Sequence, residues 1–75
     1  MIKVKESIKL HNKATVLVCD MFPDEDIKGT LISNVGKHTK FEVEKPKNCF
    51  TVAKTRNIVL FGSDDYSKIT TIKFE

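Results

Sequence analysis

Hydrophobic and polar residues alternate along the first ten positions of the chain. One face of an extended chain takes four apolar side chains: Ile2, Val4, Ile8 and Leu10. The opposite face takes Lys3, Lys5, Ser7 and Lys9, and Glu6 interrupts the apolar row. A period of two places successive side chains on opposite sides of a pleated strand. Residues 2–10 are therefore predicted to form a strand with one face in the core and one in water.

Similar extended segments recur along the chain, separated by short polar breaks at the spacing typical of a barrel or sandwich. We expect strands at approximately 2–10, 14–20, 28–34, 39–45, 49–53, 57–61 and 69–74. Tight hairpins are expected at 11–13, 34–37 and 45–48. Residues 16–18 and 58–61 are apolar on both faces, which predicts central strands that are covered from two sides.

Little helix is expected. Val, Ile and Thr total 21 residues, whereas Ala, Leu and Met total 8, and branching at Cβ favours strands. One helical turn fits at 23–26, where a proline precedes three acidic residues. Sequential hairpins favour an antiparallel meander whose closure removes exposed edges. The predicted fold is all-β: a small antiparallel barrel of about five to seven short strands, SH3-like or OB-like.

The length of 75 residues indicates one domain, residues 1–75, with 40% hydrophobic residues to build its core. Such a domain buries only about 60% of its unfolded surface, so we expect a monomer or a weak homodimer. The N-terminus shows no basic segment followed by an apolar stretch, and no run approaches the roughly 18 apolar residues of a membrane span. We expect a cytoplasmic protein without membrane contact.

Residues with catalytic or metal-binding chemistry are few and scattered. Cys19 and Cys49 lie in predicted strands and are expected to be buried, reduced thiols. Together with His11 and His38 they lack the paired spacing of zinc ligands. The acidic loop 20–26 lacks the glycine and distal glutamate of a calcium-binding loop. No nucleophile with a histidine and an orienting group, and no glycine-rich phosphate loop, is recognisable. We expect no enzyme activity, no cofactor and no metal.

Charge is segregated along a chain of net charge +3. Residues 1–13 carry +3, 14–36 carry −3, 37–56 carry +4 and 57–75 carry −1. The lysines that could contact a polyanion are Lys3, Lys5, Lys9, Lys37 and Lys40. The simpler interpretation of lysines on a strand face is that they protect an edge from aggregation.

A second set of side chains is predicted to bind a macromolecular partner: Phe22, Tyr66, Lys45, Lys47, Lys54 and Arg56. Phe22 follows a methionine at the mouth of the acidic loop, so it either contacts a protein or covers the open end of the core. The other phenylalanines are expected inside, which leaves few aromatic rings on which bases could stack.

The function that these patterns favour is a non-enzymatic interaction module that regulates a macromolecular partner. Twelve lysines accompany a single arginine, a composition typical of AT-rich coding sequences, which suggests a low-GC bacterium or a phage. The module is accordingly expected to be a phage-type or accessory regulator. Arginine is the best side chain for bidentate contacts to phosphate or guanine, and it is scarce here. A protein partner is therefore favoured. The alternative is an OB-like or SH3-like barrel that binds nucleic acid through its basic surface.

Overall fold

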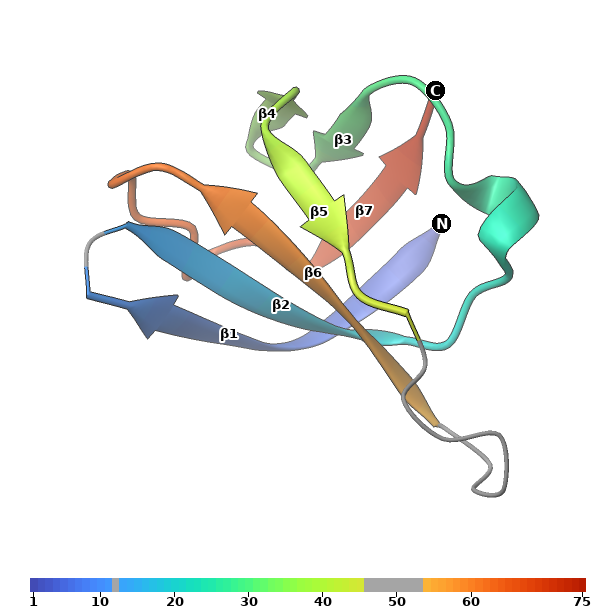
Figure 1. The fold of residues 1–75 in the computed structure, drawn as a ribbon, viewed down its shortest axis with the longest axis horizontal. Coiled ribbons are helices and arrows are strands. Elements are labelled where there is room, and N and C mark those ends of the chain that lie inside the picture. Colours follow the sequence, from blue (N-terminus) through green and yellow to red (C-terminus); the bar gives the residue numbers. More distant parts are fainter. Residues whose placement is uncertain (12, 46–53) are drawn as a thin grey trace.

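A computed structural model describes residues 1–11, 13–45 and 54–75, and it contains seven strands and one short helical turn (Figure 1). The strands are β1 (Ile2–Leu10), β2 (Ala14–Asp20), β3 (Leu31–Ser33), β4 (Gly36–His38), β5 (Phe41–Val43), β6 (Thr55–Phe61) and β7 (Thr71–Phe74). The turn is the 3-10 helix η1 (Asp24–Asp26), where one helical turn was predicted. All strand pairs are antiparallel. The prediction of an all-β fold with little helix is confirmed.

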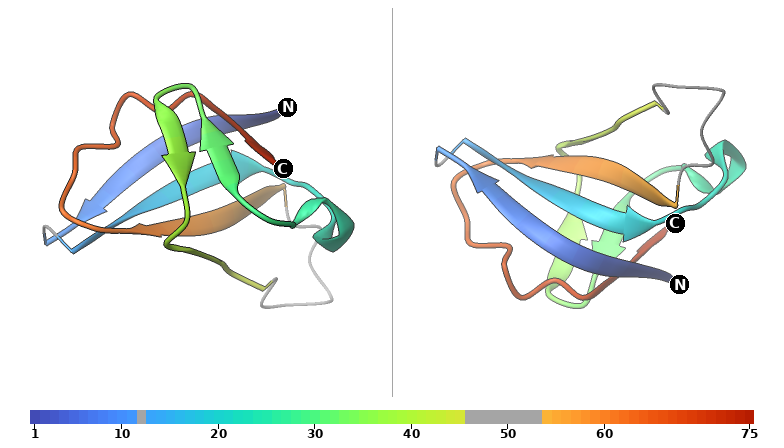
Figure 2. Two further views of the ribbon diagram at one scale, coloured as in Figure 1. Left: turned by 90° about the horizontal axis from the view of Figure 1, so that it is seen from above. Right: turned by 90° about the horizontal axis from the view of Figure 1, so that it is seen from below.

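The strands follow the order β4-β3-β7-β1-β2-β6-β5 in one curled sheet. Strand β1 is shared between two halves, because its first residues pair with β7 and the rest pair with β2. Figure 2 (left) shows β3 and β4 lying across β1, β2 and β6, so the two halves form two layers. The sequence predicted a plain meander, but β7 lies between β3 and β1.

The sheet is roughly barrel-like but open. The edge strands β4 and β5 are not paired with each other, which corrects the expectation of a closed barrel. Each edge strand has only three residues, and short edges offer few unpaired backbone groups to other chains. The sheet therefore avoids a long exposed edge without closing.

Two predicted segments differ from the structure or lie outside it. Residues 34–37 were assigned to a hairpin turn, but β4 already begins at Gly36, with Ser33 opposite Gly36 and Leu31 opposite His38. The predicted strand 49–53 lies outside the described residues. The predicted hairpins 11–13 and 45–48 lie partly outside them, because residue 12 and residues 46–48 are not described. Next to Asn12, the backbone of His11 takes a positive φ of 44°.

A β-bulge in β1 reverses the alternation seen in the sequence. Val4 lies opposite Cys19 but Glu6 lies opposite Val18, so one extra residue stands in β1 between these pairs. An extra residue moves every later side chain to the other face. Val4 is buried, whereas Ile8 and Leu10 are 43% and 42% exposed. The prediction that Ile8 and Leu10 share the core face with Val4 is therefore wrong.

The hydrophobic core lies between the two halves of the sheet. Its fully buried side chains are Leu17, Leu31, Ile58, Leu60, Ile72 and Cys19. The rings of Phe22 and Phe41 pack on Phe74 of β7, with centroid distances of 5.6 Å and 5.8 Å. Residues 17, 19, 58 and 60 all belong to the inner faces of β2 and β6. Among the described residues, the core cluster takes side chains from one face of each of these two strands.

Candidate protein-interaction face

The outward-facing side of β1, β2 and β6, continued by β5, carries rows of apolar side chains. Residues directly opposite each other on antiparallel strands share a face. The register therefore gives three rows: Leu10, Ala14 and Phe61; Ile8, Val16 and Val59; Glu6, Val18 and Asn57. We call the surface formed by these nine residues the outer face. Figure 2 (right) looks towards this side, with β1, β2 and β6 nearest the viewer.

The outer face exposes large apolar side chains. Ile8, Leu10 and Phe61 are 42–44% exposed, and the valines of the outer face are half-buried. Ala14 is buried between its cross-strand partners Leu10 and Phe61. Residues 16–18 and 58–61 were predicted to be covered from two sides, but the core cluster lies on their inner side alone. Phe61, expected inside, is thus an exposed aromatic ring.

Carboxylates border the outer face. Glu6 stands opposite Val18, and Glu42 of β5 stands opposite Val59. The next carboxylate along β5 belongs to Glu44, whose Oε2 accepts a hydrogen bond of 3.3 Å from Nδ2 of Asn57. At the far end of β2, Asp20 forms an ion pair of 3.3 Å with Lys5. The outer face is therefore an apolar strip with carboxylates at its border.

Phe22, predicted to contact a partner or to cover the core, lies inside the molecule. Its side chain is 4% exposed and belongs to the core cluster, where it packs on Phe74. The described structure therefore places Phe22 as a cover over the core and gives it almost no surface.

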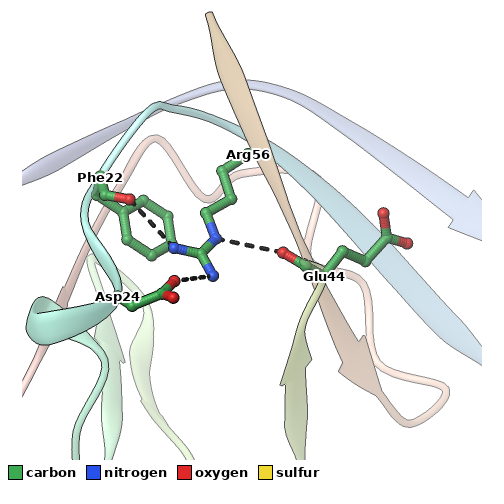
Figure 3. A network of polar contacts seen from close by, with 4 residues as sticks. All are labelled: Phe22, Asp24, Glu44 and Arg56. Atoms are coloured by element: carbon green, nitrogen blue, oxygen red, sulfur yellow. Dashed lines mark hydrogen bonds and ion pairs between the residues drawn. The ribbon is translucent and has the colours of Figure 1, made fainter. Parts of the chain in front are cut away.

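Arg56, another predicted partner-binding residue, is 5% exposed and engaged in internal contacts (Figure 3). Its Nε donates to the carbonyl of Glu44 (3.2 Å) and its Nη1 to the carbonyl of Phe22 (3.1 Å). Nη2 forms an ion pair of 2.5 Å with Asp24, and the guanidinium lies 4.9 Å from the centre of the Phe22 ring. Arg56 thus ties β6 to the end of β5 and to the segment before η1.

The predicted lysines are spread over the molecule. Lys3, Lys5, Lys9, Lys37, Lys40, Lys45 and Lys54 are all exposed, and Lys47 lies outside the described residues. Lys37 and Lys40 come together with a predicted aromatic residue, Tyr66, around a cavity of about 380 Å³, and Lys45 and Arg56 line a second cavity. The first cavity is also lined by Phe61 and Asp64.

A serine and a histidine that the sequence did not connect lie together on the β3–β4 hairpin. The Oγ of Ser33 is 2.7 Å from Nε2 of His38, and it accepts a hydrogen bond of 3.2 Å from the backbone N–H of Val35. The ring of Tyr66 meets His38 edge to face at 5.2 Å. Ser33 and His38 are diagonal neighbours on the two strands of a tight hairpin. Their spacing of five residues would have predicted this contact if residues 36–38 had been recognised as a strand.

The contact between Ser33 and His38 joins the two strands of the β3–β4 hairpin. Within the described residues, no hydrogen bond reaches Nδ1 of His38, and Ser33 is buried. Burial lowers the pKa of His38 below its ordinary value of 6.5, which favours the neutral ring at neutral pH. The Ser33 hydroxyl donates to the carbonyl of Gly36 at 3.3 Å.

The lowered pKa of His38 makes stability depend on pH. Below about pH 6.5 the unfolded chain takes up a proton at His38 that the folded chain resists, so the free energy of unfolding should fall as the pH drops from 7 towards 5. His38→Gln should reduce this slope, measured by urea denaturation at a series of pH values. The carboxyls of Asp65 and Glu75 also have lowered pKa values, through hydrogen bonds from Ser67 and Lys73, and act in a separate, more acidic window. An unchanged slope in His38→Gln would contradict the assignment.

Cys19 is a free, buried thiol. Burial and the neighbouring Asp20 raise its pKa to about 12, so the sulfur stays protonated and unreactive at neutral pH. Among residues 1–11, 13–45 and 54–75, no three His, Cys, Asp or Glu side chains gather as a metal-binding group. In the same part of the chain, no helix is long and apolar enough to cross a membrane.

Comparisons with protein-family models, with curated proteins and with solved structures give no match to this chain. The fold and the outer face therefore define the protein only by class: a small all-β domain that presents an apolar, acid-bordered sheet surface.

Proposed function

We propose that this protein is a non-enzymatic interaction module that binds and regulates a protein partner through its outer face. The observation that carries the proposal is the exposure of Ile8, Leu10 and Phe61 on neighbouring strands. Large apolar side chains that cluster on a surface, rather than standing singly, are typical of protein contact sites. An exposed aromatic ring within such a cluster supplies the large contact area on which binding energy depends.

The acidic border supports a protein partner over nucleic acid at this surface. Glu6 and Glu42 lie on the outer face or directly beside it, and carboxylates repel phosphate. The single arginine, which would suit phosphate best, points inward and is 5% exposed.

The test compares outer-face variants with a control that removes an exposed apolar side chain elsewhere. Ile8→Ser combined with Phe61→Ser should weaken partner binding at least about tenfold, because an interface of this kind depends on a few central side chains. Val35→Ser, at a position 53% exposed in the β3–β4 turn, should leave binding unchanged. Photo-crosslinking from position 61 in a lysate of the source cells would capture the partner, and titration with the purified partner would measure the affinity. Equal binding by all variants would contradict the proposal.

Nucleic-acid binding is a second candidate because one cavity brings cations and aromatic rings together. Lys37 and Lys40 line it with Phe61 and Tyr66, and Phe61 is a ring that the sequence placed in the core. Bases stack on exposed aromatic rings while lysines neutralise phosphates.

The experiment for this second candidate is a salt titration with mixed-sequence single- and double-stranded DNA and RNA. Micromolar binding at physiological salt, steeply weakened by salt and abolished by Lys37→Glu with Lys40→Glu, would favour nucleic acid over a protein partner. Absence of binding to any of them would retain the protein-partner proposal.

A further inference from the structure

The charges around the outer face differ in sign from those of the whole chain. The chain carries a net charge of +3, but Glu6, Glu42 and Glu44 border the apolar rows. Of the nearby opposite charges, Lys5 is paired with Asp20 and Arg56 is turned inward. Three carboxylates thus border the apolar strip, and that of Glu44 also accepts a hydrogen bond from Asn57.

Distance decides which charges a bound partner would meet. Successive rows are two residues apart along a strand, or about 7 Å, which is within the screening length of about 8 Å at physiological ionic strength. Charges on the opposite layer of the molecule lie farther away and are largely screened. A partner that touches the apolar strip thus meets Glu6, Glu42 and Glu44, and beside Phe61 it also meets Lys40.

The spacing of the carboxylates indicates the width of the element that fits between them. Glu6 stands on β1 and Glu42 on β5, which are three strand spacings apart, or about 14 Å. An α-helix with its side chains is about 10–12 Å across. A helix lying along β2 and β6 would place its apolar stripe on Val16, Val59 and Phe61 and its flanking residues beside the two carboxylates.

We propose, building on the proposed function, that the outer face binds a cationic amphipathic helix of the partner protein. Its aliphatic or aromatic side chains pack on the rows of Ile8 and Phe61, and its lysines or arginines pair with Glu6 and Glu42. Most of the lysines and arginines of the partner helix would lie at the end of the outer face that carries Glu6 and Glu44. The opposite end of the outer face, at Phe61, has a cation beside it. There the carbonyl of Lys40 accepts the Phe61 N–H at 3.0 Å.

The experiment is a selection from a display library of random linear peptides on the immobilised full chain. Peptides that bind the outer face are those lost on the Ile8→Ser, Phe61→Ser variant and kept on Val35→Ser. We expect these peptides to combine lysine or arginine with aliphatic residues at helical spacing. Glu6→Lys with Glu42→Lys should weaken their binding at least about tenfold. The matched control, Glu25→Lys with Asp26→Lys in η1, makes the same charge change at exposed positions away from the outer face and should change binding little.

The outcomes separate the two proposals. Outer-face peptides that are acidic or uncharged, or whose binding survives Glu6→Lys with Glu42→Lys, would overturn the cationic helix and leave the protein-binding function standing. Selected peptides that bind equally well to the Ile8→Ser, Phe61→Ser variant would overturn both. Circular dichroism of each variant checks that its strands are intact.

Discussion

Replacement of Arg56 by leucine is expected to lower the free energy of unfolding by about 3 kcal/mol. The guanidinium is 5% exposed, and its loss leaves the carbonyls of Phe22 and Glu44 without their donors. A hydrogen bond from a charged donor contributes roughly 1.5–3 kcal/mol, and the ring contact with Phe22 adds to it. The ion pair contributes least, because Asp24 is 80% exposed and well solvated. Urea denaturation measures the change.

Two control variants separate the parts of this network. Asp24→Asn should cost less than about 1 kcal/mol, since it removes only the solvated partner. Arg56→Lys keeps the charge, but its three donors sit on one nitrogen and cannot reproduce the contacts that Nε, Nη1 and Nη2 make in three directions. Its stability should therefore fall between those of the leucine variant and the wild type. A leucine variant as stable as the wild type would show that the packed aliphatic side chain compensates for the lost contacts, as happens at some buried ion pairs.

Truncation of Leu17 to alanine should lower the free energy of unfolding by about 3 kcal/mol, whereas Val16→Ala should cost less than about 1 kcal/mol. Leu17 is 0% exposed in the core, so its removal leaves a cavity as well as lost apolar burial. Val16, the next residue, is half-buried on the outer face, where water fills the space left by a smaller side chain.

Adjacent positions of one strand make this a direct comparison of the two faces of β2. If both substitutions lowered the free energy of unfolding equally, the outer face would have to be as fully covered as the inner face. That result would contradict the proposal that the outer face is free to bind a partner. Denaturant midpoints with unchanged slopes would confirm that only stability, and not the extent of unfolding, has changed.

The strands were predictable from sequence because a period of two is a local property. β1, β2, β6 and β7 coincide with predicted segments, since each alternates or is continuously apolar. β4 was not predicted because the segment 36–38 is short and polar and has no apolar alternation. It forms a strand by pairing with β3. The position of β7 between β3 and β1 depends on pairing between distant residues, which periodicity does not encode.

The outer face was hidden in the sequence by the bulge in β1. The one sign of it was Glu6, which interrupts an otherwise regular apolar row. Regular alternation would have turned that carboxylate into the core, where an unpaired charge is very costly. The extra residue turns Glu6 outward, and it turns Ile8 and Leu10 outward with it. The internal contacts of Arg56 could not be predicted from the sequence either, because its partners Phe22 and Glu44 are 34 and 12 residues away along the chain.

Strand β1 pairs with β2 and with β7, and the two pairings differ strongly in the loop-closure entropy that they cost. Its far end turns directly into β2, where Leu10 pairs with Ala14 four residues later, whereas Ile2 pairs with Ile72 seventy residues later. Because the cost of closing a loop grows as (3/2)RT ln n, the second contact costs roughly 2.5 kcal/mol more than the first. The β1–β2 hairpin can therefore form early and alone, while the β1–β7 pairing must wait until other contacts have shortened the loop. Val4, just before the bulge, pairs with Cys19 of β2 and donates its N–H to the carbonyl of Thr70, so it joins the part of β1 that pairs locally to the part that pairs with β7.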